Sequence, residues 1–266
     1  MKLLLLLLLA IPAAGEDLRV ATYNVRYPAP GDGANVWHER KDLFVRSLEQ
    51  MRLDVFGTQE LFAPQAEYIT AKLPQYAWFG ISRRGNHEDE HMGVFYRMDK
   101  LKLIESGNFW LSPTPEVAGS SAWGMTLPRM ATWGVFEIKS TGRRLYFVNT
   151  HFPHRREDEA ARLECAKVLA AFLLKRPRGI PAILTGDFNT DAAGAAYELL
   201  TQTLKEAKPA DAGGTFHGFS GKPGTARIDW ILYSGLKLKG SEIVRFNEAG
   251  RYPSDHFPVV AAFSAP

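Results

Sequence analysis

The most informative segment of the chain is Arg251-Tyr-Pro-Ser254-Asp255-His256-Phe-Pro-Val259, near the C-terminus. A carboxylate stands beside an imidazole, and the apolar run 259–263 follows. An Asp-His pair alone is a weak signal, since such pairs occur by chance. Five further polar clusters also lie at the ends of apolar, strand-like runs: Thr22-Tyr-Asn24, Thr58-Gln-Glu60, Asn149-Thr-His151, Gly186-Asp187-Phe-Asn189 and Arg227-Ile-Asp229. We expect the loops that carry these clusters to gather along one edge of the molecule.

The chain alternates expected strands with expected helices. β-Branched and aromatic runs predict strands, and apolar residues at helical spacing predict helices. The expected strands are 18–23, 54–57, 92–97, 129–138, 145–151, 182–185, 228–233, 236–246 and 258–263, and the expected helices are 36–51, 64–73, 156–175 and 193–203. Residues 105–128 predict a long ordered loop or a pair of irregular strands. Two β-α-β halves predict an α/β fold of two mixed sheets packed face to face, with helices outside.

The composition is that of a soluble globular protein, with 45% hydrophobic and 23% charged residues. A chain of 266 residues suits one sizeable domain, or at most two small ones. The net charge of +3 permits an anionic substrate but does not require nucleic acid, because basic residues occur only in short pairs such as Arg83-Arg84. We expect these pairs to be solvated surface charge. The only cysteine, Cys165, excludes an internal disulfide and is expected to be a buried small hydrophobe.

Residues 1–15 have the pattern of a secretory signal peptide. A positively charged N-terminal residue, Lys2, is followed by the apolar run 3–10 and by residues 12–15, whose small side chains suit a cleavage site. The apolar run is shorter than the roughly 20 residues that span a bilayer, although an uncleaved anchor is the alternative. We therefore expect one domain over residues 16–266, exported to the periplasm or the extracellular space.

Polar residues of these types at strand ends suit metal-assisted cleavage of a phosphate ester. Such a reaction needs charge neutralisation and an activated in-line water. Mg²⁺ prefers carboxylate oxygens, and Glu60 follows a buried strand, so Glu60 is the first candidate ligand. Its alternatives are a surface glutamate or a helix-capping partner. Asn24 can ligate the metal through water or hold a catalytic carboxylate, and its alternative is a turn amide.

The segment Gly186-Asp187-Phe188-Asn189 lies where a buried strand turns into a loop. Asp187 can orient or deprotonate the attacking water. Asn189 can donate to a phosphate oxygen. The structural alternative is a turn with a helix N-cap, because Asp and Asn favour both. That alternative suits Asp191 better than Asp187.

Two histidines are candidates for contact with the phosphate. His256 can donate to it as an imidazolium or act as base to the water, provided that a carboxylate fixes its tautomer; Asp229 is the candidate partner. In extended backbone Asp255 points to the opposite side from His256, so Asp255 can reach the metal while His256 faces the phosphate. His151, at another strand end, can contact a phosphate oxygen, although a lone histidine is more often structural.

Together these motifs resemble the endonuclease/exonuclease/phosphatase superfamily, to which DNase I belongs. The resemblance covers residues 18–263, and Gly-Asp-Phe-Asn and Ser-Asp-His are its most specific pieces. It implies a four-layer α/β sandwich, phosphoesterase activity and a single tight Mg²⁺ or Mn²⁺ site. By motif, it assigns Glu60 as the metal glutamate, Asn24 as the first-strand asparagine, His151 as the phosphate-contacting histidine, Asp187 and Asn189 as the Asp-x-Asn pair, Asp229 as the aspartate that supports the histidine, and Asp255-His256 as the terminal pair.

Within the superfamily the chain resembles a bacterial exported branch. The segments 37–40, 109–123 and 129–133 carry this likeness, and they make Arg40 and Arg129 candidate substrate contacts. A structural salt bridge is the alternative for each arginine. Arg26 stands where abasic-site endonucleases have an aspartate. The segment 83–91 also departs from the branch, although Glu90 can take its acidic position.

These observations predict an exported, divalent-metal-dependent phosphoesterase that acts on a small or lipid-linked phosphate ester. A secreted nuclease of DNase I type is the alternative within the same chemistry, and the chain lacks the basic loops that would favour it. An alternative of another class is a non-catalytic binding module on the same scaffold. The complete polar set argues against that module, because a degenerate enzyme usually loses an essential residue.

Overall fold

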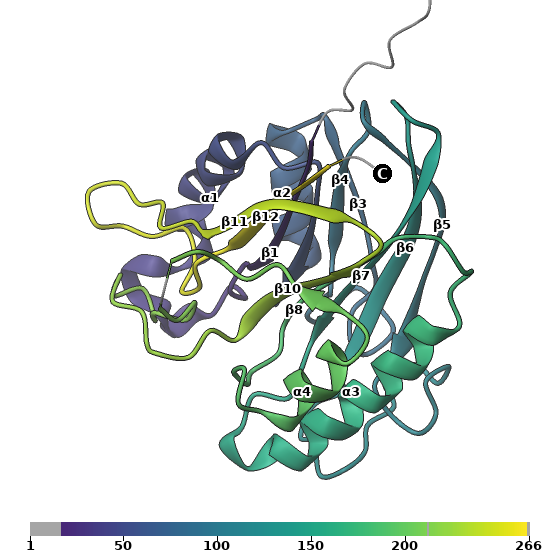
Figure 1. The fold of residues 1–266 in the computed structure, drawn as a ribbon. Helices are drawn as coiled ribbons and strands as arrows, with labels where there is room; N and C mark the ends of the chain where they lie inside the picture. The colour runs from purple at the N-terminus through teal and green to yellow at the C-terminus, as the bar shows by residue number, and fades with distance from the viewer. Residues whose placement is uncertain (1–16, 212, 265–266) are drawn as a thin grey trace, which may run out of the picture.

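The computed structural model describes residues 17–211 and 213–264 and shows two six-stranded sheets packed face to face (Figure 1). The first sheet has the order β11-β12-β1-β2-β4-β3, and the second has the order β5-β6-β7-β8-β10-β9. The strands of the first sheet are β1 (Leu18–Asn24), β2 (Val55–Gln59), β3 (Tyr76–Phe79), β4 (Val94–Arg97), β11 (Lys237–Ile243) and β12 (Val259–Ser264). Those of the second are β5 (Leu101–Trp110), β6 (Met130–Ile138), β7 (Arg143–His151), β8 (Ala182–Asp187), β9 (Lys205–Glu206) and β10 (Asp229–Ser234).

Helices cover the outer face of each sheet and complete four layers. The α-helices are α1 (Trp37–Met51), α2 (Ala63–Lys72), α3 (Glu159–Leu174) and α4 (Ala195–Thr201), and short 3-10 helices cover Pro30–Asn35 and Arg156–Asp158. Phe44 and Ile69 of α1 and α2 pack with Phe56 in a core on the first sheet. Between the sheets, Val20 and Phe147 belong to a second apolar core. The expected four-layer α/β sandwich is confirmed.

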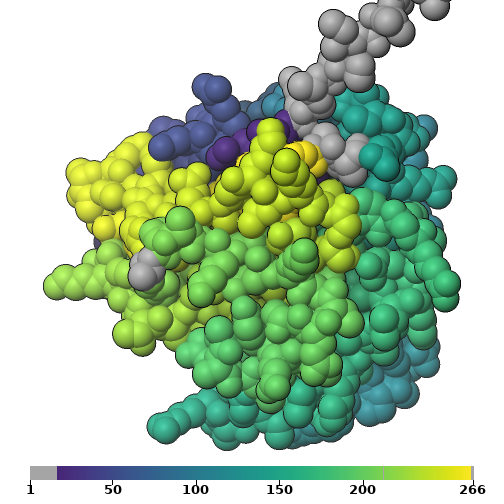
Figure 2. Space-filling model, viewed as in Figure 1, coloured from purple at the N-terminus to yellow at the C-terminus, as the bar shows by residue number. Residues whose placement is uncertain are grey.

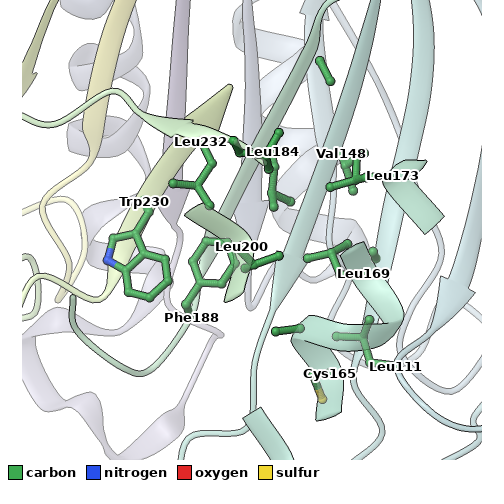
Figure 3. Close-up of a cluster of buried hydrophobic side chains, with 14 of the residues drawn as sticks. Leu111, Val148, Cys165, Leu169, Leu173, Leu184, Phe188, Leu200, Trp230 and Leu232 are labelled. Atoms are coloured by element: carbon green, nitrogen blue, oxygen red, sulfur yellow. The ribbon is translucent and has the colours of Figure 1, made fainter. Parts of the chain in front are cut away.

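The third core lies between the second sheet and α3 with α4. Phe188 stacks on Trp230 with ring centroids 4.5 Å apart, and leucines of β8, α3 and α4 surround them (Figure 3). Cys165 belongs to this core and is fully buried, as its expected role as a small hydrophobe requires. Burial raises the pKa of its thiol to about 12, so the sulfur stays protonated at neutral pH.

Strand pairing brings sequence-distant segments to one edge of the sandwich. The β1–β2 and β7–β8 pairs are parallel, so their carboxyl ends meet in pairs. In the second sheet His151, Asp187 and Asp229 are in register across three strands. In the first sheet β12 pairs with β1, so residues 259–264 lie beside the N-terminal strand, and yellow and purple atoms adjoin in Figure 2. The polar strand ends of both sheets therefore converge.

Three strands of the sandwich were not among the expected ones, and all three lie at sheet edges. Residues 101–110 form β5, an edge strand with a register shift between Leu103 and Glu105, in part of the region 105–128 for which a loop or irregular strands were predicted. Residues 205–206 form β9 at the other edge of the second sheet, and 76–79 form β3 at an edge of the first. Edge strands have one exposed flank, and β5 carries Glu105, Ser106 and Asn108, so it lacks the apolar run that marks a central strand. The segment expected to be a signal peptide lies outside the described residues. Among the residues described, no helix has the length and apolar character needed to cross a membrane.

Candidate active site

A cavity of about 630 Å³ opens at the edge where the strand ends of both sheets meet. Seven of the predicted site residues line it: Glu60, Arg129, His151, Asp187, Asn189, Asp255 and His256. Ten others line it as well: Arg26, Tyr27, Phe62, Arg83, Asp89, Glu90, Leu127, His154, Phe216 and Ile228. Asn24 and Asp229 lie behind the lining residues, to which they are hydrogen-bonded. The sequence-distant polar clusters thus form one site.

His256 and Asp229 form a buried hydrogen-bonded pair. His256 Nδ1 lies 2.9 Å from Asp229 Oδ2, and both side chains are almost fully buried. Burial by itself lowers the pKa of His256, but the carboxylates of Asp229, Asp187 and Asp255, with Asp229 contributing most, together raise the pKa to about 10. His256 is therefore an imidazolium at neutral pH. Its Nε2 faces Asp187, with 3.8 Å between Nε2 and Oδ2.

Asp187 is at the centre of the site. Its Oδ1 accepts a hydrogen bond from the Asn189 backbone N–H at 3.0 Å, and its Oδ2 accepts one from Asn24 Nδ2 at 3.1 Å. Burial raises the pKa of Asp187, and the nearby Asp229 adds to this effect. A carboxyl with a raised pKa is suited to accept a proton from water.

His151 and Asn189 complete the wall beside Asp187. His151 Nε2 lies 3.6 Å from Asp187 Oδ2. Burial, with the charge of Arg129, lowers the pKa of His151 well below its usual range, so the imidazole is neutral. Asn189 has a left-handed backbone with φ of 51° and donates from Nδ2 to the Phe152 carbonyl at 3.1 Å. That bond holds the turn after β8 in place.

Asn24 connects carboxylates that come from the two sheets. Its Nδ2 donates to Glu60 Oε1 and to Asp187 Oδ2, each at 3.1 Å, and its Oδ1 accepts from the Arg26 backbone N–H. Glu60 has φ of 57°, and its Oε2 accepts from the Tyr27 backbone N–H at 3.1 Å. The amide nitrogen of Asn24 faces the acids and the side chain does not line the cavity. The placement corresponds to the expectation that Asn24 holds a carboxylate, not to its assignment as a metal ligand.

Glu60 and Asp255 present carboxylate oxygens to the same cavity, and Arg26 lies between them. Arg26 Nη1 is 3.8 Å from Glu60 Oε2, and Arg26 Nε is 3.7 Å from Asp255 Oδ2. Burial, with the charge of Glu60, raises the pKa of Asp255. Carboxylate oxygens are the donors that a divalent cation such as Mg²⁺ prefers, and a cation bound by both carboxylates would share them with Arg26.

Asp187, Asp229 and His256 also have possible ligand atoms within 4.8 Å of one another and could hold a metal ion. A cation bound by His256 Nδ1 and Asp229 Oδ2 would break their 2.9 Å hydrogen bond. We therefore favour Glu60 and Asp255 as the ligands. Both Asp255 and His256 line the cavity, although extended backbone predicted that they would face opposite sides.

The two predicted substrate arginines have different surroundings. Arg40 is 1% exposed and does not line the cavity. It donates to main-chain carbonyls, those of Val25, Arg26, Asn35 and Pro253. The prediction of a substrate contact is thus wrong for Arg40, and its alternative, a salt bridge, is also not what holds it. Arg129 lines the cavity, and its Nη2 lies 3.1 Å from His154 Nδ1.

Several lining residues were missed from the sequence. Arg83 was expected to be solvated, yet it is buried and paired with Asp89 and Glu90. The acidic pair six and seven residues after Arg83 was the available signal. Phe216, exposed by 48%, contacts the His256 ring edge to face and has no motif to mark it.

Comparison with known proteins accords with this geometry. The profile of the Endonuclease/Exonuclease/phosphatase family matches residues 21–256. A solved structure of a family member from Bacteroides thetaiotaomicron is 34% identical, with a TM-score of 0.88, over 94% of this chain and 98% of that chain. The mannosyl-6-phosphatase of the same organism is 35% identical, with a TM-score of 0.86, over 92% and 99%.

More distant structures share the fold alone. The catalytic domain of human Nocturnin is 21% identical, with a TM-score of 0.74, over 93% of this chain and 94% of that chain. None of the curated proteins compared with the chain matches it. The family match and the likeness to the phosphatase place the chain among the phosphoester hydrolases. The chain belongs to the Endonuclease/Exonuclease/phosphatase family.

Proposed function

We propose that the protein is an exported, Mg²⁺- or Mn²⁺-dependent phosphatase that hydrolyses the phosphate monoester of a small substrate by in-line attack of water. The observation that carries this proposal is the Asn24 amide, which joins Glu60 and Asp187 from opposite sheets beside the His256–Asp229 pair. This brings a candidate metal ligand, a candidate base and an imidazolium together at one cavity. The mannosyl-6-phosphatase activity of the 35% identical relative supports a monoester as substrate.

Each residue has a part in the proposed reaction. Glu60 and Asp255 would hold the divalent cation, which would neutralise phosphate charge when bound. Asp187, oriented by Asn24, accepts the proton of the attacking water. His256, kept as an imidazolium by Asp229, donates to a phosphate oxygen. His151 and Asn189 contact the remaining phosphate oxygens from the wall of the cavity.

A substrate panel with and without EDTA tests the proposal. It contains p-nitrophenyl phosphate, bis-p-nitrophenyl phosphate, sugar phosphates, sphingomyelin and plasmid DNA. We expect monoester hydrolysis that EDTA abolishes and Mg²⁺ or Mn²⁺ restores. Preferential cleavage of DNA or of diesters would favour the nuclease instead, and activity unchanged in EDTA would end the metal-dependent proposal. Export is tested separately, by locating the protein in cell fractions and sequencing the N-terminus of the mature form.

A further inference from the structure

The segment 82–91 forms an ordered wall of the cavity outside the catalytic group. Its ends are joined by a β-bridge between Ser82 and His91, and the Arg83 backbone N–H donates to the Glu90 carbonyl at 2.9 Å. The Trp110 indole N–H donates to the Arg83 carbonyl at 2.6 Å. At Gly85, with φ of 81°, an added Cβ would lie 2.7 Å from Ala118 Cβ. These contacts hold the segment against the second sheet, so its side chains are pre-positioned.

Within this wall a buried arginine is neutralised by two carboxylates. Arg83 Nη2 lies 3.0 Å from Asp89 Oδ1, and Arg83 Nη1 lies 2.9 Å from Glu90 Oε2. All three residues line the cavity, and the Arg83 and Glu90 side chains are about 10% exposed, at 9% and 11%. Glu90 accepts from Arg83 through Oε2, which leaves Oε1 to accept from a hydroxyl group. Asp89 also accepts from Arg84 Nε and from the Glu90 backbone N–H, each at 2.7 Å, and its Oδ2 retains a lone pair for a hydroxyl group.

The arginine charges of this wall are paired with carboxylates of the same wall, so the wall offers no unpaired cation to a second anionic group. Arg26 is paired with Asp32 through two hydrogen bonds, at 2.8 and 3.0 Å. Arg83 has two acidic partners, whereas the partner found for Arg129 among the described residues is the imidazole of His154. The charge of Arg129 thus remains for a single phosphate. Beside segment 82–91 the two carboxylates of Asp89 and Glu90 offset the two guanidinium groups of Arg83 and Arg84, so a second phosphate would gain no net attraction there.

We propose that segment 82–91 forms the subsite for the leaving group, and that this group is a neutral polyhydroxylated molecule, a sugar or sugar alcohol, whose hydroxyls donate to Asp89 and Glu90. The inference rests on the proposed phosphatase function and deepens it. It names the wall that selects the substrate, and it excludes bisphosphates and polynucleotides as good substrates. Carboxylates beside an arginine present acceptors and donors together, as vicinal hydroxyls require.

The test compares p-nitrophenyl phosphate, mannose 6-phosphate and fructose 1,6-bisphosphate on wild type, Glu90→Gln and Asp89→Asn. Glu248→Gln is the matched control, because it breaks an exposed pair with Arg46 outside the cavity. We expect each subsite variant to raise KM for mannose 6-phosphate about tenfold, since a lost hydrogen bond to a charged group has about this effect. kcat/KM for p-nitrophenyl phosphate, whose leaving group donates no hydrogen bond to this wall, should fall by less than kcat/KM for mannose 6-phosphate. The kcat/KM ratio of fructose 1,6-bisphosphate to mannose 6-phosphate should rise in both variants.

A second measurement needs no variant and covers the case in which a substitution prevents folding. Free mannose should inhibit p-nitrophenyl phosphate hydrolysis by the wild type competitively, and cyclohexanol, of similar size with one hydroxyl, should not. The subsite proposal would be overturned if the variants lost kcat/KM equally on both monoesters. It would also be overturned if free mannose did not inhibit and the wild type did not prefer mannose 6-phosphate. Absence of hydrolysis of every monoester would instead reject the phosphatase proposal itself.

Discussion

The space between the two sheets differs at its two ends. Away from the site it is filled by apolar side chains such as Val20, Phe147 and Phe263. Beneath the cavity it is polar: Gln59 Nε2 donates to Asn149 Oδ1 at 2.7 Å, and Asn149 Nδ2 donates to the Thr58 carbonyl at 2.7 Å. Apolar packing is non-directional and stabilises the sandwich, whereas hydrogen bonds between the sheets set their relative position. The comparison indicates that stability and catalytic geometry come from different ends of one interface.

The largest effect that separates the two ends is expected for Asp187→Asn. Removing the carboxylate should lower kcat by about 10²- to 10⁴-fold, since it removes the proposed proton acceptor. The thermal midpoint should be equal or higher. Burial disfavours the charged form of Asp187 and raises its pKa, and the amide of Asn carries no charge to bury. Initial rates on p-nitrophenyl phosphate and calorimetry measure both. Activity within twofold of wild type would remove Asp187 from the mechanism.

At the apolar end, Phe147→Ala should lower stability and leave kcat nearly unchanged. Deleting a fully buried aromatic ring costs about 3–5 kcal/mol of unfolding free energy. The kcat of the folded fraction should remain near that of wild type, because Phe147 does not line the cavity. Urea denaturation followed by fluorescence gives the first quantity, and assays below the unfolding temperature give the second. A tenfold fall in kcat without unfolding would show that the two ends are coupled.

Gly57→Ala places a methyl group in the polar end itself. The added Cβ would lie 2.3 Å from both Asn149 Oδ1 and Thr185 Oγ1, so the network must move. We expect a loss of about 1–3 kcal/mol of stability and a lower kcat together, because the strands that carry the site would separate. Gly240→Ala, where no heavy atom lies within 4 Å of the added Cβ, is the control. If Gly57→Ala changed stability alone, the network would have no part in positioning the catalytic groups.

The last comparison concerns the pH dependence of stability. The folded-state pKa of His256, about 10, lies above the roughly 6.5 of an unfolded histidine. The folded state therefore binds this proton more tightly, and its contribution to stability is complete below about pH 6.5 and lost as pH rises through 10. The wild type in EDTA should lose stability between these pH values by more than Asp229→Asn does, since that variant lacks the carboxylate that retains the proton. Denaturation midpoints at pH 6, 8 and 10 measure the difference, and parallel curves would contradict it.

Much of the sandwich was predictable because central strands are buried on both faces. The strands Ala182–Asp187 and Asp229–Ser234 are mostly apolar, and each has its functional aspartate at one end, Asp187 last and Asp229 first. Both the strand and the position of its functional residue can therefore be recognised in the sequence. The edge strand β5 escaped, since one flank is solvated and its pattern is polar. At the site, motif residues that follow strands were visible for the same reason. The Gln59–Asn149 network and the pairing of Arg83 were not, because their partners are set by folding rather than by local pattern.

The position of β12 in the first sheet has a consequence for how activity arises. This strand lies between β11 and β1, and the Asp255-His256 pair directly precedes it. Until residues 259–264 insert, β1 has a neighbour on one side only, and the Asp255-His256 pair lacks the strand that anchors it on its C-terminal side. We therefore expect the site to be completed only when β12 has paired with β1, and a form truncated before β12 to have little activity on phosphate esters.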